Sequence, residues 1–95
     1  MILYLDTSNL VKLYVDEAHS DLVRDWAEAA EAVAISRVGY PEALSAFIRR
    51  SDRGDMTDED LALARASLEA DWPAFILLPL NERRAGGLVE NADFP

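Results

Sequence analysis

Short apolar runs alternate with longer amphipathic segments along the whole chain. Three of the runs, residues 2–6, 32–35 and 74–78, have the length and composition of β-strands. The first run ends on a carboxylate, Asp6, and the last is continuously apolar ahead of Pro79, which is typical of a strand buried on both faces. Strands that alternate with helices favour a parallel sheet covered by helices. The pattern therefore predicts an α/β fold.

Apolar residues spaced three and four positions apart predict helices between these strands. The predicted helices span residues 9–16, 20–31, a segment that ends near 53, and 57–72. The third helix begins near Arg37 or near Tyr40, because Gly39 and Pro41 complicate its first turns, and Ser36 is a candidate cap. Asn81 could cap one further helix near the end of the chain.

Composition limits the class of protein. A chain of 95 residues, 51% of them hydrophobic, can build one core, so we expect a single domain. The absence of cysteine excludes disulfides and thiolate metal sites. No apolar stretch reaches the length of a membrane span and the N-terminus lacks the features of a signal peptide, so we expect a cytoplasmic protein without a membrane partner.

The charge distribution gives a mixed indication about nucleic acid. The formal net charge of −9 argues against a dedicated nucleic-acid binder with a basic face. Four arginines nevertheless crowd one stretch, and a small basic patch on an acidic protein can dock a phosphate or an acidic segment. These residues are Arg37, Arg49, Arg50 and Arg53.

Two carboxylates are the best candidates for chemistry. Asp6 ends the first strand, and in open α/β sheets ligands bind outside the carboxyl ends of the strands. Glu42 falls early in the third helix, close to the end of the second strand. Two such acids facing one crevice would repel each other unless a cation lay between them, as in metal-assisted phosphodiester hydrolysis. The alternative is structural: Asp6 would cap the following helix, and Glu42 would be an ordinary first-turn acid.

Two segments carry a resemblance to a known family. Residues 2–14, ILYLDTSNLVKLY, resemble the opening strand and first helix of PIN domains, and residues 34–46, AISRVGYPEALSA, resemble the segment with the second acid of that family. The chain is most similar to VapC-type toxins of bacterial toxin–antitoxin pairs. The resemblance implies an α/β/α sandwich around a parallel sheet and the activity of a Mg²⁺-dependent endoribonuclease, with Mn²⁺ as an alternative ion.

The resemblance also assigns roles to individual residues. It implies that Asp6 is a direct metal ligand, that Glu42 is the second acid, and that Ser8 supports the metal site or its water. Thr7 is expected to be a cap or loop residue. The resemblance further implies RNA as substrate, a homodimer, and a cognate antitoxin whose tail neutralises the site.

The chain departs from the family in its last part. The third acid of a PIN domain and the apolar helix after it have no counterpart here, so residues 1–95 resemble a partial domain whose C-terminal strands and helices are missing. The two remaining acids should hold a hard cation poorly, so we expect activity to drop with metal affinity and the 95-residue chain to be inactive or nearly so. Two alternatives stay open. One is a non-catalytic interaction module that binds an antitoxin or partner subunit. The other is a phosphatase of the haloacid dehalogenase type, which wants a second aspartate where Ser8 stands.

The partial resemblance predicts self-association. In PIN domains the first strand is central, so here the strand that ends at Asp6 should lie at an exposed edge, which invites pairing. We expect the 95-residue species to dimerise or aggregate, or to be one piece of a cut chain still bound to the other. Size-exclusion chromatography tests this expectation, and a well-behaved dilute monomer would contradict it.

Overall fold

The three predicted strands form one parallel sheet. In the structure, a computed structural model that describes residues 1–79, β1 (Ile2–Leu5) pairs with β2 (Ala32–Ser36). On its other side β2 pairs with β3 (Ile76–Leu78), which gives the order β1-β2-β3. Within the described residues β1 therefore lies at an edge of the sheet, as predicted.

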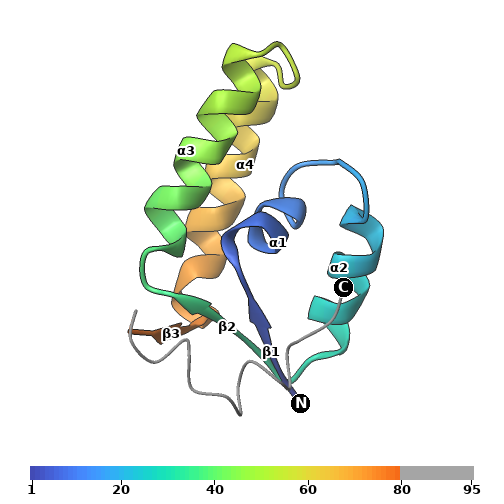
Figure 1. Cartoon of the computed structure of the whole chain (residues 1–95), viewed down its shortest axis with the longest axis vertical. Coiled ribbons are helices and arrows are strands. Elements are labelled where there is room, and N and C mark those ends of the chain that lie inside the picture. Colours follow the sequence, from blue (N-terminus) through green and yellow to red (C-terminus); the bar gives the residue numbers. More distant parts are fainter. Residues whose placement is uncertain (80–95) are drawn as a thin grey trace.

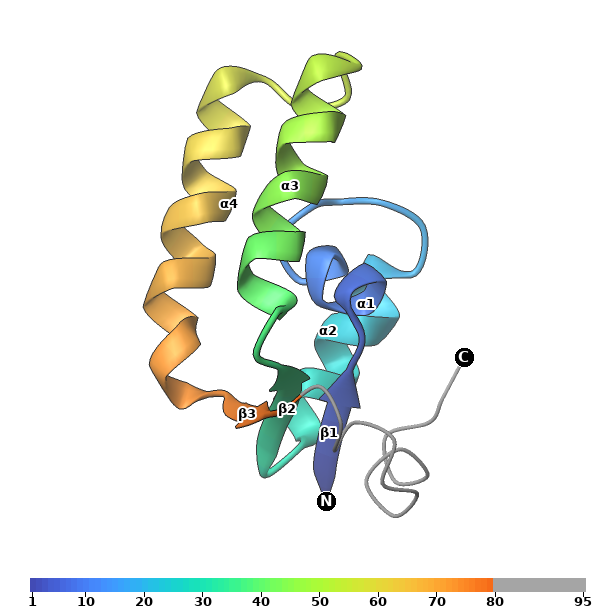
Figure 2. The ribbon, with the colours of Figure 1, turned by 60° about the vertical axis from the view of Figure 1, so that its left-hand side comes forward.

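Helices flank this sheet. They are α1 (Thr7–Lys12), α2 (Ser20–Ala29), α3 (Gly39–Asp52), α4 (Asp58–Asp71) and the short 3₁₀ helix η1 (Trp72–Ala74). Figures 1 and 2 show α3 and α4 side by side as a long pair that extends away from the sheet. The predicted α/β class is confirmed, and the arrangement is compatible with an α/β/α sandwich. No helix among residues 1–79 is long and apolar enough to cross a membrane. The helix predicted after Asn81 lies outside the described residues.

Local signals in the sequence explain the helix ends. The Thr57 hydroxyl accepts a hydrogen bond from the Asp60 amide at 3.0 Å and so caps α4, whose first turn carries three acids. Gly54 follows the end of α3 with φ of +85°, in the left-handed region that favours glycine. His19 precedes α2 and its side chain is exposed.

Two helix starts differ from the prediction. α1 begins at Thr7 and not at residue 9, because Asp6 caps it by accepting a hydrogen bond from the Asn9 amide at 2.9 Å. Ser36 is the last residue of β2 and does not occupy the cap position of α3, which is Val38. The Ser36 hydroxyl instead accepts a hydrogen bond from the Val38 amide at 3.3 Å, and so stabilises the turn between strand and helix.

The last strand is shorter and more exposed than predicted. η1 takes up the start of the predicted strand, so β3 begins only at Ile76. Ile76 and Leu77 are 39% and 41% exposed, whereas Leu78 is buried. Successive side chains of a strand point to opposite faces, so Ile76 and Leu77 are exposed on different faces of β3. The prediction that this strand is buried on both faces is therefore wrong for the described part of the chain.

The core lies where α1 and α3 meet the sheet. Its members come from every large element and include Leu3, Leu5, Leu10, Val11, Val23, Ile35, Ala43, Ala46, Phe47, Ala64 and Leu68. Phe47 is completely buried and meets Tyr14 edge to face, with ring centroids 6.2 Å apart. Because Ala43 and Ala46 are small, the side chains of α1 can pack closely on α3.

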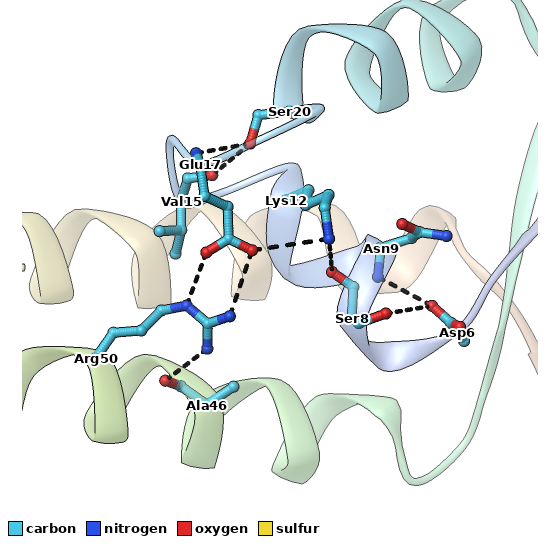
Figure 3. A network of polar contacts seen from close by, with 9 residues as sticks. All are labelled: Asp6, Ser8, Asn9, Lys12, Val15, Glu17, Ser20, Ala46 and Arg50. Atoms are coloured by element: carbon cyan, nitrogen blue, oxygen red, sulfur yellow. Dashed lines mark hydrogen bonds and ion pairs between the residues drawn. The ribbon is translucent and has the colours of Figure 1, made fainter. Parts of the chain in front are cut away.

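A half-buried polar network ties the segment after α1 to α3 (Figure 3). The Arg50 guanidinium donates from Nε to Glu17 Oε1 at 2.9 Å and from Nη2 to Glu17 Oε2 at 3.3 Å. Lys12 Nζ lies 3.8 Å from the same carboxylate. The Ser20 hydroxyl accepts from the Glu17 amide and donates to the Val15 carbonyl, which fixes the loop that carries Glu17.

We predict that Arg50→Gln destabilises the fold by about 1 to 3 kcal/mol, because it leaves the Glu17 carboxylate without its bidentate partner in a half-buried position. Urea unfolding followed by circular dichroism measures the loss. Arg53→Gln is the matched control, since Arg53 pairs with Asp55 on the exposed surface and such pairs contribute little. Equal losses in the two variants would contradict the structural role of the Glu17–Arg50 pair.

Tyr14 joins the end of α1 to the end of α4. Its hydroxyl donates to Asp71 Oδ2 at 2.7 Å. Burial, the hydrogen bond to Asp71 and the charge of that carboxylate all raise the pKa of Tyr14. A raised pKa in the folded state means that folding favours the protonated hydroxyl.

Stability should therefore fall as the pH rises above about 10, where the tyrosine of the unfolded chain loses its proton and folded Tyr14 does not. Tyr14→Phe removes both the hydrogen bond and the ionisation. We expect it to be less stable than the unsubstituted chain near neutral pH, with the difference shrinking at alkaline pH. Urea unfolding over a series of pH values tests this, and a constant difference would contradict it.

Candidate functional site

The carboxyl ends of β1 and β2 bring the two predicted acids to one end of the sheet. The strands pair in parallel with Leu5 opposite Ile35, so the chain leaves both strands at the same end. Asp6 follows β1 directly, and α3 begins shortly after β2. Figure 2 shows α1 and α3 starting at this common end.

Asp6 is an exposed residue held by the first turn of α1 (Figure 3). Its Oδ1 atom accepts one hydrogen bond from the Asn9 amide at 2.9 Å and another from the Ser8 hydroxyl at 3.1 Å. Ser8 thus contacts Asp6 directly. Because both bonds end on Oδ1, the lone pairs of Oδ2 are left, within residues 1–79, for water or a ligand.

Glu42 lies in the first turn of α3 and is joined to the same segment by Thr7. The Thr7 hydroxyl donates to Glu42 Oε1. Thr7 is the first residue of α1, so the prediction of a cap or loop residue is wrong. Through its hydrogen bond, Thr7 positions the second acid. The sequence alone does not predict this role. Its only signal is that Thr7 and Ser8 are consecutive hydroxyl residues, and the structure pairs each of them with one of the two acids.

An open hollow of about 510 Å³ lies on the Glu42 side of this pair. It is lined by Thr7, Pro41, Glu42, Ser45 and Arg49. Ser45 and Arg49 follow Glu42 on the same face of α3, three and seven residues along. Asp6 and Ser8 do not line the hollow and are connected to it through Thr7. The exposed Arg49 guanidinium can bind carboxylate or phosphate oxygens in a bidentate manner.

The four arginines of this stretch do not form one basic patch. Arg50 points to Glu17, and Arg53 pairs with Asp55 at 3.0 Å. Arg49 lines the hollow beside Glu42, and Arg37 lines a different hollow. Sequence proximity predicted the cluster, but only Arg49 and Arg50 lie in α3, where successive residues point in different directions. Arg37 precedes the helix and Arg53 follows it.

Asp6 and Glu42 offer oxygen donors, the kind of ligand that a hard cation takes. Within residues 1–79 no three or more His, Cys, Asp or Glu side chains gather in a way that could hold a metal ion, so the described site has two acids. Asp6 and Glu42 each use one oxygen within the protein. Mg²⁺ is commonly held by one or two carboxylates together with water and substrate phosphate, and an all-oxygen donor set suits it better than a soft metal.

Comparison with models of known protein families finds no matching family, and a search of curated proteins finds no matching relative. The resemblance to PIN domains therefore stays a prediction that rests on the residues around Asp6 and Glu42.

Proposed function

We propose that this chain carries the metal-dependent site of a PIN-type endoribonuclease toxin, which hydrolyses RNA phosphodiester bonds in the cytoplasm with Mg²⁺. One observation supports the proposal above the others. Asp6 and Glu42, from different βα units, are joined through the consecutive hydroxyls of Ser8 and Thr7 beside an open hollow that also contains Arg49.

The side chains have distinct roles in this proposal. Asp6 and Glu42 hold the cation through the oxygens that make no hydrogen bond within residues 1–79. Such an ion lowers the pKa of a bound water and stabilises charge on the phosphate. Ser8 and Thr7 orient the two carboxylates by hydrogen bonds, and Arg49 binds a phosphate oxygen of the RNA.

The proposed partners follow from the same assignment. A homodimer and a cognate antitoxin belong to it, and Mn²⁺ is an alternative ion. The net charge of −9 and the exposed carboxylates suit a basic antitoxin segment, whose arginine would pair with Asp6 or Glu42 in place of the cation.

A non-catalytic interaction module is the second candidate, and a specific observation favours it. The bonds that Asp6 accepts from Asn9 and Ser8 are those of a helix cap, and Glu42 is held by Thr7. Both acids thus have structural roles that need no metal. In this case the chain binds a partner segment at the same surface and does not cut RNA.

Asp6→Asn distinguishes the two candidates, because asparagine caps helices as well as aspartate and removes only the charge. For a nuclease we expect Mg²⁺-dependent cleavage of a structured RNA that EDTA abolishes and that Asp6→Asn lowers by about a hundredfold or more. Gel electrophoresis of end-labelled RNA measures the rate.

Asp21→Asn is the matched control, since Asp21 is an exposed acid in the first turn of α2. Asp21→Asn also removes one negative charge, but at a position away from the candidate site, so it should leave the rate of RNA cleavage unchanged. If the unsubstituted chain shows no cleavage above the Asp6→Asn background, the ribonuclease proposal fails for this chain and the interaction module is favoured.

A further inference from the structure

A second hollow opens beside the candidate site. It has a volume of about 450 Å³ and is lined by Arg37, Tyr40, Pro41, Glu69, Trp72 and Pro73. Pro41 lines this hollow and also the one that contains Glu42 and Arg49. The two hollows therefore adjoin at the start of α3, one rich in charged groups and the other in aromatic rings.

The second hollow has aromatic walls with fixed polar groups. The rings of Tyr40 and Trp72 meet edge to face, with centroids 4.9 Å apart. The Tyr40 hydroxyl donates to Glu69 Oε2 at 3.1 Å, which leaves Oε1 as an acceptor. Desolvation and the Glu69 carboxylate raise the pKa of Tyr40, and a tyrosine hydroxyl is protonated at neutral pH in any case, so it donates there.

Arg37 adds a positive charge at the rim. Its backbone amide is bonded to the Leu78 carbonyl at 3.0 Å, which anchors the residue, while its side chain is exposed. No acid among residues 1–79 forms an ion pair with its guanidinium. Arg37 and Arg49 thus place positive charge in both hollows of an otherwise acidic chain.

We propose that the second hollow binds an unpaired base of the RNA whose phosphate lies in the first hollow. The inference rests on the proposed function and adds a substrate preference to it. Proteins bind unpaired bases by stacking them on aromatic rings or on arginine, and here Tyr40, Trp72 and Arg37 supply those surfaces. A nucleotide chain that passes over Pro41 would place adjacent groups in both hollows.

Glu69 gives the hollow a preference among bases. A carboxylate only accepts hydrogen bonds, so it favours a base that presents an amino group. Cytosine presents its N4 amino group where uracil presents the O4 carbonyl, and the two rings are otherwise similar in size. The hollow should therefore bind cytosine in preference to uracil.

Binding of short fluorescent oligocytidylate and oligouridylate tests the proposal. Fluorescence anisotropy in EDTA prevents metal-dependent cleavage and measures affinity alone. We expect the cytidylate to bind about five- to tenfold more tightly than the uridylate. Glu69→Gln should remove this discrimination, since its amide both donates and accepts and still bonds Tyr40, and Arg37→Gln should weaken both oligonucleotides.

The control is Arg53→Gln, which makes the same charge change beyond the far end of α3 and should leave both affinities unchanged. Equal affinity for the two oligonucleotides, or discrimination that survives Glu69→Gln, would overturn the proposal. A third result would also overturn it. If neither oligonucleotide binds, and a proline-rich peptide quenches the tryptophan fluorescence of the unsubstituted chain but not that of Trp72→Phe, the hollow binds protein and not RNA.

The oligonucleotide-binding experiment and the RNA-cleavage experiment can succeed or fail independently of each other. Discrimination in EDTA without Asp6-dependent cleavage would support the base site and count against the nuclease. Asp6-dependent cleavage without discrimination would support the nuclease and overturn the base site.

Discussion

The parallel pairing of β1 with β2 is the constraint on which the rest of the structure depends. Because Leu5 lies opposite Ile35, both strands deliver the chain to the same end of the sheet. A register shift of one residue would turn the buried Leu3 and Leu5 to the opposite face, so the core itself fixes the register. Asp6 and the start of α3 are neighbours because of this pairing, although 35 residues separate Thr7 from Glu42 along the chain.

Packing and polar contacts then hold α1 against α3 at two levels. Leu10 and Val11 are buried in the same core as the small residues of α3. Further from the sheet, the Glu17–Arg50 pair connects the loop after α1 to the last turn of α3. Nearer the sheet, the Thr7–Glu42 bond connects the starts of the two helices. Because these two bonds lie at opposite ends of the interface between α1 and α3, they restrict rotation of α1 against α3. The relative position of the two acids is set by this combination.

Much of the fold could be predicted from the sequence, because local signals specify it. The spacing of apolar residues predicted where the strands and helices lie, and Thr57 indicated the start of α4. The prediction failed where tertiary geometry decides. The exposure of Ile76 and Leu77 depends on how much of each face of β3 the neighbouring elements cover, and no periodicity encodes that coverage. The directions of the arginine side chains also depend on the neighbouring acids, because Arg50 pairs with Glu17 and Arg53 with Asp55.

The candidate site was predictable only in part for the same reason. Asp6 and Glu42 stand out because each follows a strand, whereas the function of Thr7 depends on a contact between segments distant in sequence. The two interpretations of Asp6, helix cap and metal ligand, are physically compatible. The cap uses Oδ1, and a cation would use Oδ2, so capping holds the carboxylate in place without consuming its capacity to bind. The fold thereby fixes an exposed carboxylate at low entropic cost, which a catalytic site and a docking surface both require.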